Sequence, residues 1–269
     1  MQVAAIQMVS GLSLEANLQA AHALLAQAAQ QGVELAVLPE YFCLMGQRDT
    51  DKLALREDFG AGRIQDFLAA TARALGLWIA GGTMPLTAGD AGHVRNSQLV
   101  FSPAGECVAR YDKIHLFRFD NGREQYDESR VIESGSAPQA FELPSRDGRR
   151  WRVGLSVCYD LRFPELYRGL KADLLLVPSA FTHVTGQAHW ELLLRARAVE
   201  NLAYVVAPAQ GGVHESGRRT WGHSMVVDPW GTVLARRAED GAGLALAQID
   251  GERLAQVRTQ LPALEHRVL

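Results

Sequence analysis

Short apolar runs alternate with helix-patterned segments along almost the whole chain, and this alternation limits the possible folds more than any other feature. Residues 13–31 carry apolar side chains at helical spacing, and the apolar run 33–38 follows them. The same order recurs where a helix opened by Pro164 precedes the apolar run 173–177. Apolar runs of this length are typical of buried strands, and strands that alternate with helices predict an α/β protein.

Two proline- and glycine-containing turns show that the sheets are mixed rather than purely parallel. The turns at residues 102–105 and 228–231 each lie between two strand-like runs, which is a hairpin signal. Further strands are expected at residues 1–8, 77–81, 96–101, 106–112, 151–157, 203–207, 224–227, 232–236 and 244–249. Further helices are expected at residues 63–75, 188–201 and 252–260.

The runs 33–39 and 172–178 resemble each other, because each follows a helix and ends at a proline. Two similar sheets packed face to face, each covered by helices, accommodate this pseudo-repeat. No low-complexity linker divides the chain, and 269 residues that are 48% hydrophobic can bury one large core. We therefore expect a single domain over residues 1–269.

Charge and apolar patterning exclude several classes of partner. The net charge of −3 offers no electrostatic attraction to nucleic acid or to an anionic membrane surface. No basic segment precedes the short apolar run 1–8, and no stretch approaches the roughly 20 apolar residues of a membrane span. We expect a cytoplasmic protein that binds neither nucleic acid nor membranes.

The sequence contains no motif for a metal or a nucleotide cofactor. H-E-x-x-H, the phosphate-binding G-x-x-x-x-G-K-[ST] and a dinucleotide-binding G-x-G-x-x-G after a strand are all absent. The three cysteines, Cys43, Cys107 and Cys158, are odd in number and have no C-x-x-C spacing. This argues against a disulfide framework and a zinc site, so we predict no metal and no cofactor.

Cys158 lies at the junction between an expected buried strand and a helix. The run 151–157 ends directly before it, and Pro164 opens a helix shortly afterwards. Ligand sites of open α/β sheets lie at the carboxyl ends of strands. Backbone N–H groups of such a turn can stabilise the oxyanion that forms when sulfur attacks a carbonyl. The junction therefore predicts a covalent acyl-transfer enzyme.

The thiol needs a base or a nearby cation, because an ordinary cysteine with a pKa of about 8.5 is mostly protonated at neutral pH. Glu40 follows the strand expected at 33–38, and Lys113 follows the strand expected at 106–112. Either charge alone is typical of a solvated strand end, but their occurrence together with Cys158 indicates a site. Four histidines remain open as the base: His115, His183, His189 and His223.

Three segments of the chain resemble, in order and context, the catalytic motifs of the nitrilase (carbon–nitrogen hydrolase) superfamily. They are Leu38-Pro39-Glu40, the segment 111–116 around Lys113, and the segment 157–165 around Cys158. The resemblance covers nearly the whole chain. It implies a four-layer αββα sandwich with two mixed β-sheets and a Glu-Lys-Cys triad, assembled as a homodimer or higher homo-oligomer.

The resemblance also implies a role for each triad residue. Glu40 would be the general base, Cys158 the nucleophile, and Lys113 would stabilise the oxyanion together with the backbone N–H of Tyr159. Glu128 is at the position that resembles the family's second glutamate, with Glu124 and Glu133 as the competing choices.

Arg162 matches a family position that contacts a substrate carboxylate in some branches. The alternative is a structural role, in a buried ion pair with Asp160 or Glu165. The sequence leaves both interpretations open.

The residues after the nucleophile indicate the branch. True nitrilases carry Trp then Glu there, whereas this chain has Tyr159-Asp160, as the amidase branches do. The stretches 178–198 and 222–231 resemble the deaminated-glutathione amidases. This implies a small anionic amide substrate, deaminated glutathione, which would be hydrolysed to 2-oxoglutarate and cysteinylglycine.

Two alternatives stay open. Residues 113–117 are closer to the ω-amidases, which act on α-ketoglutaramate-like mono-amides, and the following segment 117–125 is more charged than expected for the first branch. A non-catalytic binding or scaffolding member of the family is the third hypothesis. The joint presence of Glu40, Lys113 and Cys158 argues against it.

Overall fold

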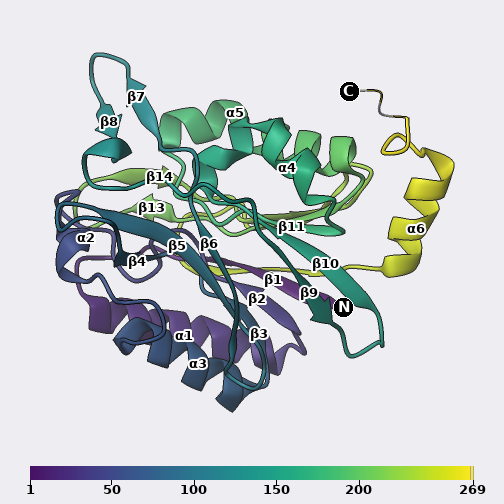
Figure 1. Cartoon of the computed structure of the whole chain (residues 1–269), viewed down its shortest axis with the longest axis horizontal. Helices are drawn as coiled ribbons and strands as arrows, with labels where there is room; N and C mark the ends of the chain where they lie inside the picture. Colours follow the sequence, from purple (N-terminus) through teal and green to yellow (C-terminus); the bar gives the residue numbers. More distant parts are fainter. Residues whose placement is uncertain (267, 269) are drawn as a thin grey trace.

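A computed structural model describes residues 1–266 and 268 of the chain (Figure 1). One sheet contains β1 (Gln2–Gln7), β2 (Leu35–Val37), β3 (Trp78–Ala80), β4 (Met84–Thr87), β5 (Val94–Phe101), β6 (Cys107–Asp112) and β17 (Gly243–Gln248). The other contains β9 (Ala140–Pro144), β10 (Arg150–Leu155), β11 (Leu174–Leu176), β12 (Tyr204–Ala207), β15 (Met225–Val227) and β16 (Val233–Arg236). The helices are α1 (Leu14–Gln30), α2 (Asp51–Ala54), α3 (Arg63–Leu75), α4 (Pro164–Leu170), α5 (His183–Asn201) and α6 (Gly251–Gln260). No described helix is both long and apolar enough to cross a membrane.

Both sheets have a parallel centre with antiparallel flanks. In the first sheet, β2 pairs in parallel with β1 and β3, and antiparallel strands continue on both sides. In the second sheet, β11 pairs in parallel with β10 and β12, again between antiparallel neighbours. The two runs that resemble each other in sequence are therefore the middle strands of two similar sheets, and the prediction of mixed sheets is confirmed.

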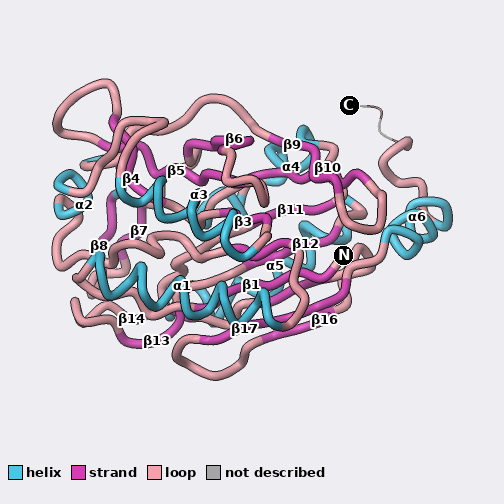
Figure 2. Tube along the Cα trace, turned by 90° about the horizontal axis from the view of Figure 1, so that it is seen from below, coloured by secondary structure: helices cyan, strands magenta, loops and turns pink. Residues whose placement is uncertain are grey.

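The alternation of side chains along β1 explains the layers. Val3 and Ala5 pack into the core between the sheets, whereas Ala4 and Ile6 pack into a second core with α1 and α3. Helices α4 and α5 cover the outer face of the other sheet, as Figures 1 and 2 show. The predicted four-layer αββα sandwich is confirmed.

The start of α5 differs from the prediction. The helix begins at His183 rather than at residue 188, and Thr182 caps it by accepting a hydrogen bond from the backbone N–H of Thr185. Gly186 disfavours a helix by propensity. It is needed in the first turn because a β-carbon there would meet the side chain of Trp221 at 2.2 Å.

Several short elements have no sequence signal of their own. The segment 117–125, in which no strand was expected, contains most of a hairpin formed by β7 (Arg118–Asp120) and β8 (Gln125–Asp127). A second hairpin joins β13 (Gly211–Val213) to β14 (Arg219–Trp221), and the 3₁₀ turn η1 (Glu128–Arg130) was also missed. The 3₁₀ turn η2 (Cys158–Arg162) lies where the turn between strand and helix was expected. Elements of three to five residues are too short to show a period.

Candidate active site

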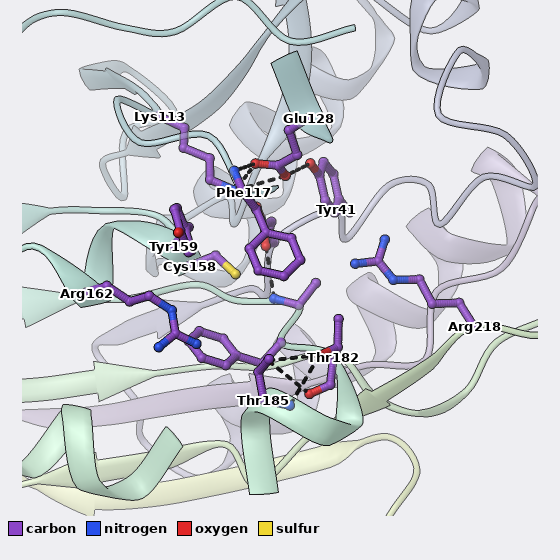
Figure 3. A pocket seen from close by; sticks show the side chains of 13 residues that line it. Tyr41, Lys113, Phe117, Glu128, Cys158, Tyr159, Arg162, Thr182, Thr185 and Arg218 are labelled. Carbon is purple, nitrogen blue, oxygen red and sulfur yellow. Dashed lines mark hydrogen bonds and ion pairs between the residues drawn. The ribbon is translucent and has the colours of Figure 1, made fainter. Parts of the chain in front are cut away.

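The ends of three strands bring Glu40, Lys113 and Cys158 to one pocket of about 320 Å³ (Figure 3). Glu40 follows β2, Lys113 directly follows β6, and Cys158 opens η2 after β10. The central strands of both sheets end at this side of the molecule, where α/β sheets place their ligand sites. The structure thus assembles the three residues that were expected to act together.

The charges of the pocket are arranged around Lys113. Its Nζ lies 2.9 Å from Oε1 of Glu40 and 2.8 Å from Oε2 of Glu128. Lys113 and Glu40 are each only 1% exposed. Of the two competing glutamates, Glu133 instead pairs with Arg95, and Glu124 does not line this pocket.

The pKa values of Lys113 and Glu128 follow from this contact. Burial by itself lowers the pKa of Lys113, but the negative charges of Glu128 and Glu40 outweigh burial and raise it above its ordinary value. Burial by itself raises the pKa of Glu128, but the charge and hydrogen bond of Lys113, with the Phe117 N–H and the Tyr41 hydroxyl, lower it below its ordinary value. Both groups are therefore charged at neutral pH.

The Glu128 pair predicts a pH-dependent stability. Because the folded-state pKa of Glu128 lies below its ordinary value of 4.5, its contribution is present above pH 4.5 and is lost as the pH falls through the folded-state pKa. Glu128→Gln should lower the free energy of unfolding at pH 7 by about 1–3 kcal/mol. Urea unfolding of both proteins at several pH values should show this difference shrinking in acid.

A surface ion pair supplies the control for this measurement. Glu142 lies 3.6 Å from Arg152, and both side chains are about half exposed. Glu142→Gln should change the free energy of unfolding by less than about 1 kcal/mol. A Glu128→Gln protein as stable as wild type at pH 7 would contradict the prediction.

The carboxylate of Glu40 is held by two donors from distant parts of the chain. Nδ2 of Asn96 donates to Oε1, and the backbone N–H of Ala180 donates to Oε2, each at 2.9 Å. Together with Lys113 these donors fix the orientation of the carboxylate. Sequence reasoning missed both, although Asn96-Ser97-Gln98 is a run of polar residues in an expected strand, and all three are buried.

Cys158 adopts a backbone conformation that is uncommon for its residue type. Its φ is +51°, in the left-handed region, and its N–H donates to the carbonyl of Pro178 at 3.0 Å. A sharp strand-to-helix turn of this kind presents a nucleophile to a pocket. Tyr159 follows in the first turn of η2, where N–H groups have no partner within the helix.

The thiol is protonated at neutral pH when the pocket holds no substrate. Burial raises the pKa of Cys158 well above its ordinary value, the negative charge of Glu40 raises it further, and the charge of Lys113 acts in the opposite direction. A nearby carboxylate that disfavours a free thiolate is also well placed to take the thiol proton during attack on a carbonyl carbon.

Asp160 connects the Lys113 segment to the Cys158 turn. It is fully buried, and its carboxylate accepts hydrogen bonds from the backbone N–H groups of Val157 and His115 at 2.8 and 3.0 Å. The hydroxyl of Tyr111 donates to it at 2.7 Å, and Nδ1 of His115 lies 2.6 Å away. One side chain thereby ties the segment around Lys113 to the segment around Cys158.

Arg162 does not form the buried ion pair that was one of its two expected roles. It pairs with neither Asp160 nor Glu165, and it lines the pocket instead. Its guanidinium lies 5.7 Å and 5.6 Å from the ring centres of Tyr159 and Phe181, with Nη2 3.3 Å from His189. Its charge faces the pocket without a carboxylate partner among the described residues.

None of the four candidate histidines lines the pocket with Cys158. His115 is bound to Asp160 and stacks on Phe163, and His183 packs edge-on against Trp221. The other two contact Arg162 and Trp221: His189 lies beside the arginine, and His223 stacks on the indole. The described residues hold no cluster of three histidine, cysteine or acidic side chains that would suit a metal ion.

Sequence reasoning missed several other pocket residues. The hydroxyl of Tyr41 donates to Oε1 of Glu128 at 2.8 Å, and Phe117 contributes its ring to the wall and its N–H to Glu128. The position of Tyr41 directly after Glu40 is the one signal that could have identified it. Thr182, Thr185 and Arg218 come from later segments and also line the pocket.

The sequence of the chain matches the model of the carbon–nitrogen hydrolase family over residues 2–259. It is 44% identical over 271 residues to the deaminated glutathione amidase of Synechocystis, and the alignment covers 98% of this chain and 97% of that protein. It is 40% identical over 272 residues to the human deaminated glutathione amidase, and the alignment covers 98% of this chain and 81% of that protein. The predicted resemblance to this branch is confirmed.

Solved structures show the same fold. The Caenorhabditis elegans NitFhit protein superposes with a TM-score of 0.87 at 37% identity, covering 99% of this chain, which spans 65% of that longer chain. Saccharomyces cerevisiae Nit3, a member of branch 10 of the nitrilase superfamily, superposes with a TM-score of 0.87 at 28% identity, covering 100% and 97% of the two chains. The chain belongs to the carbon–nitrogen hydrolase family of the nitrilase superfamily and is an amidase.

Proposed function

We propose that this amidase hydrolyses the γ-amide of deaminated glutathione through a thioester on Cys158. The observation that carries the proposal is the buried contact of Lys113 with Glu40 and Glu128 beside a thiol at a strained turn. This arrangement supplies a base, a cation and a nucleophile within one pocket. Removing any one of them would interrupt a specific step.

In the first half-reaction, Glu40 takes the thiol proton while sulfur attacks the amide carbon. The oxyanion of the tetrahedral intermediate is stabilised by Lys113 and by the backbone N–H of Tyr159. Glu40 then gives the proton to the leaving nitrogen as the C–N bond breaks. The products are cysteinylglycine and a thioester between Cys158 and the 2-oxo acid.

In the second half-reaction, Glu40 takes a proton from water, and the resulting hydroxide attacks the thioester. The same two donors stabilise the second oxyanion. Collapse breaks the C–S bond, releases 2-oxoglutarate and returns the proton from Glu40 to the sulfur of Cys158. Glu128 touches no reacting atom in this scheme, and it acts by holding Lys113.

A positively charged side chain, Arg162, lies beside Cys158, and its charge favours a substrate whose acyl group is anionic. Arg162 faces the pocket without a carboxylate partner among the described residues, and Thr185 lines the same pocket. We infer that Arg162 binds the carboxylate next to the ketone of the substrate. Two relatives, at 44% and 38% identity, are deaminated glutathione amidases, which favours deaminated glutathione over the ω-amidase substrate α-ketoglutaramate.

The test is release of 2-oxoglutarate by purified protein from deaminated glutathione and from α-ketoglutaramate, with Cys158→Ala as the blank. We expect a large preference for deaminated glutathione in kcat/KM. Preference for α-ketoglutaramate would assign the chain to the ω-amidase activity. Release from neither compound would remove the substrate proposal.

We also propose that residues 1–269 form a single catalytic domain, and the family match to residues 2–259 supports this.

We further propose that the protein forms a dimer or higher oligomer through helices on one outer face. The oligomer is supported by two exposed apolar side chains on α5: Leu192 and Val199 are 67% and 45% exposed and lie seven residues apart on one face of the helix. Light scattering measures the oligomeric state. A reducing compartment such as the cytoplasm would keep the thiol of Cys158 free.

A further inference from the structure

A second pocket of about 350 Å³ adjoins the first, and the reaction above makes no use of it. Four residues line both of them: Tyr41, Phe117, Glu128 and Arg218. The two pockets therefore share one wall, whereas Glu40, Lys113 and Cys158 line the first pocket alone.

Arg218 is a cation on this wall that forms no ion pair with any residue the structure describes. It directly precedes β14, and its guanidinium points into the pocket from the side opposite to Arg162 (Figure 3). Its Nε is buried without a hydrogen-bond partner, and its Nη1 lies 3.9 Å from Sδ of Met45. Its guanidinium lies 5.0 Å from the ring centre of Tyr126. These contacts position the charge but do not neutralise it, so an anionic ligand would bind favourably.

The other charged groups around the second pocket are already engaged. Nζ of Lys52 lies 3.7 Å from Asp49 and 4.8 Å from the ring centre of Tyr41. Asp127 accepts hydrogen bonds from Ser129, and Glu128 is held by Lys113 and Tyr41. Within the described part of the chain, Arg218 is thus the charge on this wall that is left for a ligand.

The chemistry gives the two pockets different roles. Glu40 must reach the leaving nitrogen to protonate it, and Tyr41, the next residue, lines both pockets. Arg162 lies on the other side of Cys158 (Figure 3). An acyl group whose carboxylate meets Arg162 therefore directs the leaving group past Tyr41 toward the second pocket.

We propose, on the basis of the function proposed above, that the second pocket binds the leaving group and that Arg218 binds its terminal carboxylate. The substrate class is then an amide with an anionic group on each side of the scissile bond. A primary amide, whose leaving group is ammonia, leaves this second pocket empty. Arg218 is accordingly the residue that selects a dipeptide amide.

The test compares deaminated glutathione with its C-terminal amide, in which the glycine carboxylate is neutral. With wild-type protein, kcat/KM for the acid should exceed that for the amide by about 10- to 100-fold, as expected for a hydrogen-bonded charge pair. In Arg218→Met this ratio should fall to about one, mainly through a higher KM for the acid, because a remote contact contributes uniform binding. Arg218→Lys should recover part of the ratio.

Arg219→Met is the matched control. Arg219 is the next residue, but it is exposed and its guanidinium lies 3.9 Å from Asp240, away from both pockets. Its replacement should leave the ratio at the wild-type value. Turnover of both compounds with equal kcat/KM by wild type, or an unchanged ratio in Arg218→Met, would overturn this inference alone. If wild type releases 2-oxoglutarate from neither compound, the proposed function fails, and this inference with it.

Discussion

Cys158→Ala should lose turnover by about 10⁴-fold or more, because no other group can form the thioester. The fold should tolerate the change, since alanine is smaller than cysteine and the change removes one sulfur atom at the pocket lining. Release of 2-oxoglutarate measures the turnover, and thermal unfolding checks the fold. Mass spectrometry of wild-type protein quenched during turnover should also show a covalent acyl adduct on the peptide that contains Cys158.

Cys43→Ala provides the matched control for the nucleophile. Cys43 is also buried, and burial raises the pKa of its thiol to about 12, but it packs in the core against α1 and α3. Its replacement should preserve turnover and leave the adduct on Cys158 unchanged. Turnover that survives in Cys158→Ala would contradict the thioester mechanism, whatever the substrate.

Lys113→Met should lower both turnover and stability. Loss of an oxyanion donor typically costs about 10²–10³ in turnover. The change also leaves Glu40 and Glu128 without the cation between them, and removing one partner of a buried ion pair costs about 3–5 kcal/mol. Steady-state kinetics and urea unfolding at pH 7 measure the two effects.

A double variant separates the two roles of Lys113. Lys113→Met combined with Glu128→Gln removes one of the two unbalanced carboxylates, so it should recover part of the lost stability. It should recover none of the turnover, because the oxyanion donor is still missing. Turnover within tenfold of wild type in Lys113→Met would remove the lysine from the mechanism.

The residues that lie next to strand ends were predictable. Glu40, Lys113 and Cys158 each follow a strand that the sequence marks by an apolar or alternating pattern, and the carboxyl ends of such strands converge. The middle strands β2 and β11 were predictable for the same reason. Fully buried parallel strands are short and almost continuously apolar, so their residues carry a strong local signal.

Residues whose role depends on an uncommon local geometry were not predictable. The start of α5 was placed too late, since Gly186 disfavours a helix and is retained only because Trp221 packs against it. The two roles left open for Arg162 differ only in what its side chain touches. The structure places its guanidinium near the rings of Tyr159 and Phe181 and not in an ion pair with Asp160 or Glu165, and its contact with substrate stays a prediction.

By itself, the sequence determined an α/β protein with mixed sheets and the three residues at the strand ends, because strand periodicity and the residues that follow a strand are local properties. The family, and with it the αββα sandwich, was predicted from the resemblance of three motifs. Only the tertiary structure decided how these residues are supported. The N–H of Ala180 reaches Glu40 across 140 residues of sequence, and nothing local distinguishes Arg218, which lines both pockets, from the exposed Arg219 beside it. Contacts of this kind depend on how the two sheets and their loops pack. A local sequence pattern does not identify the distant residue that a side chain will contact.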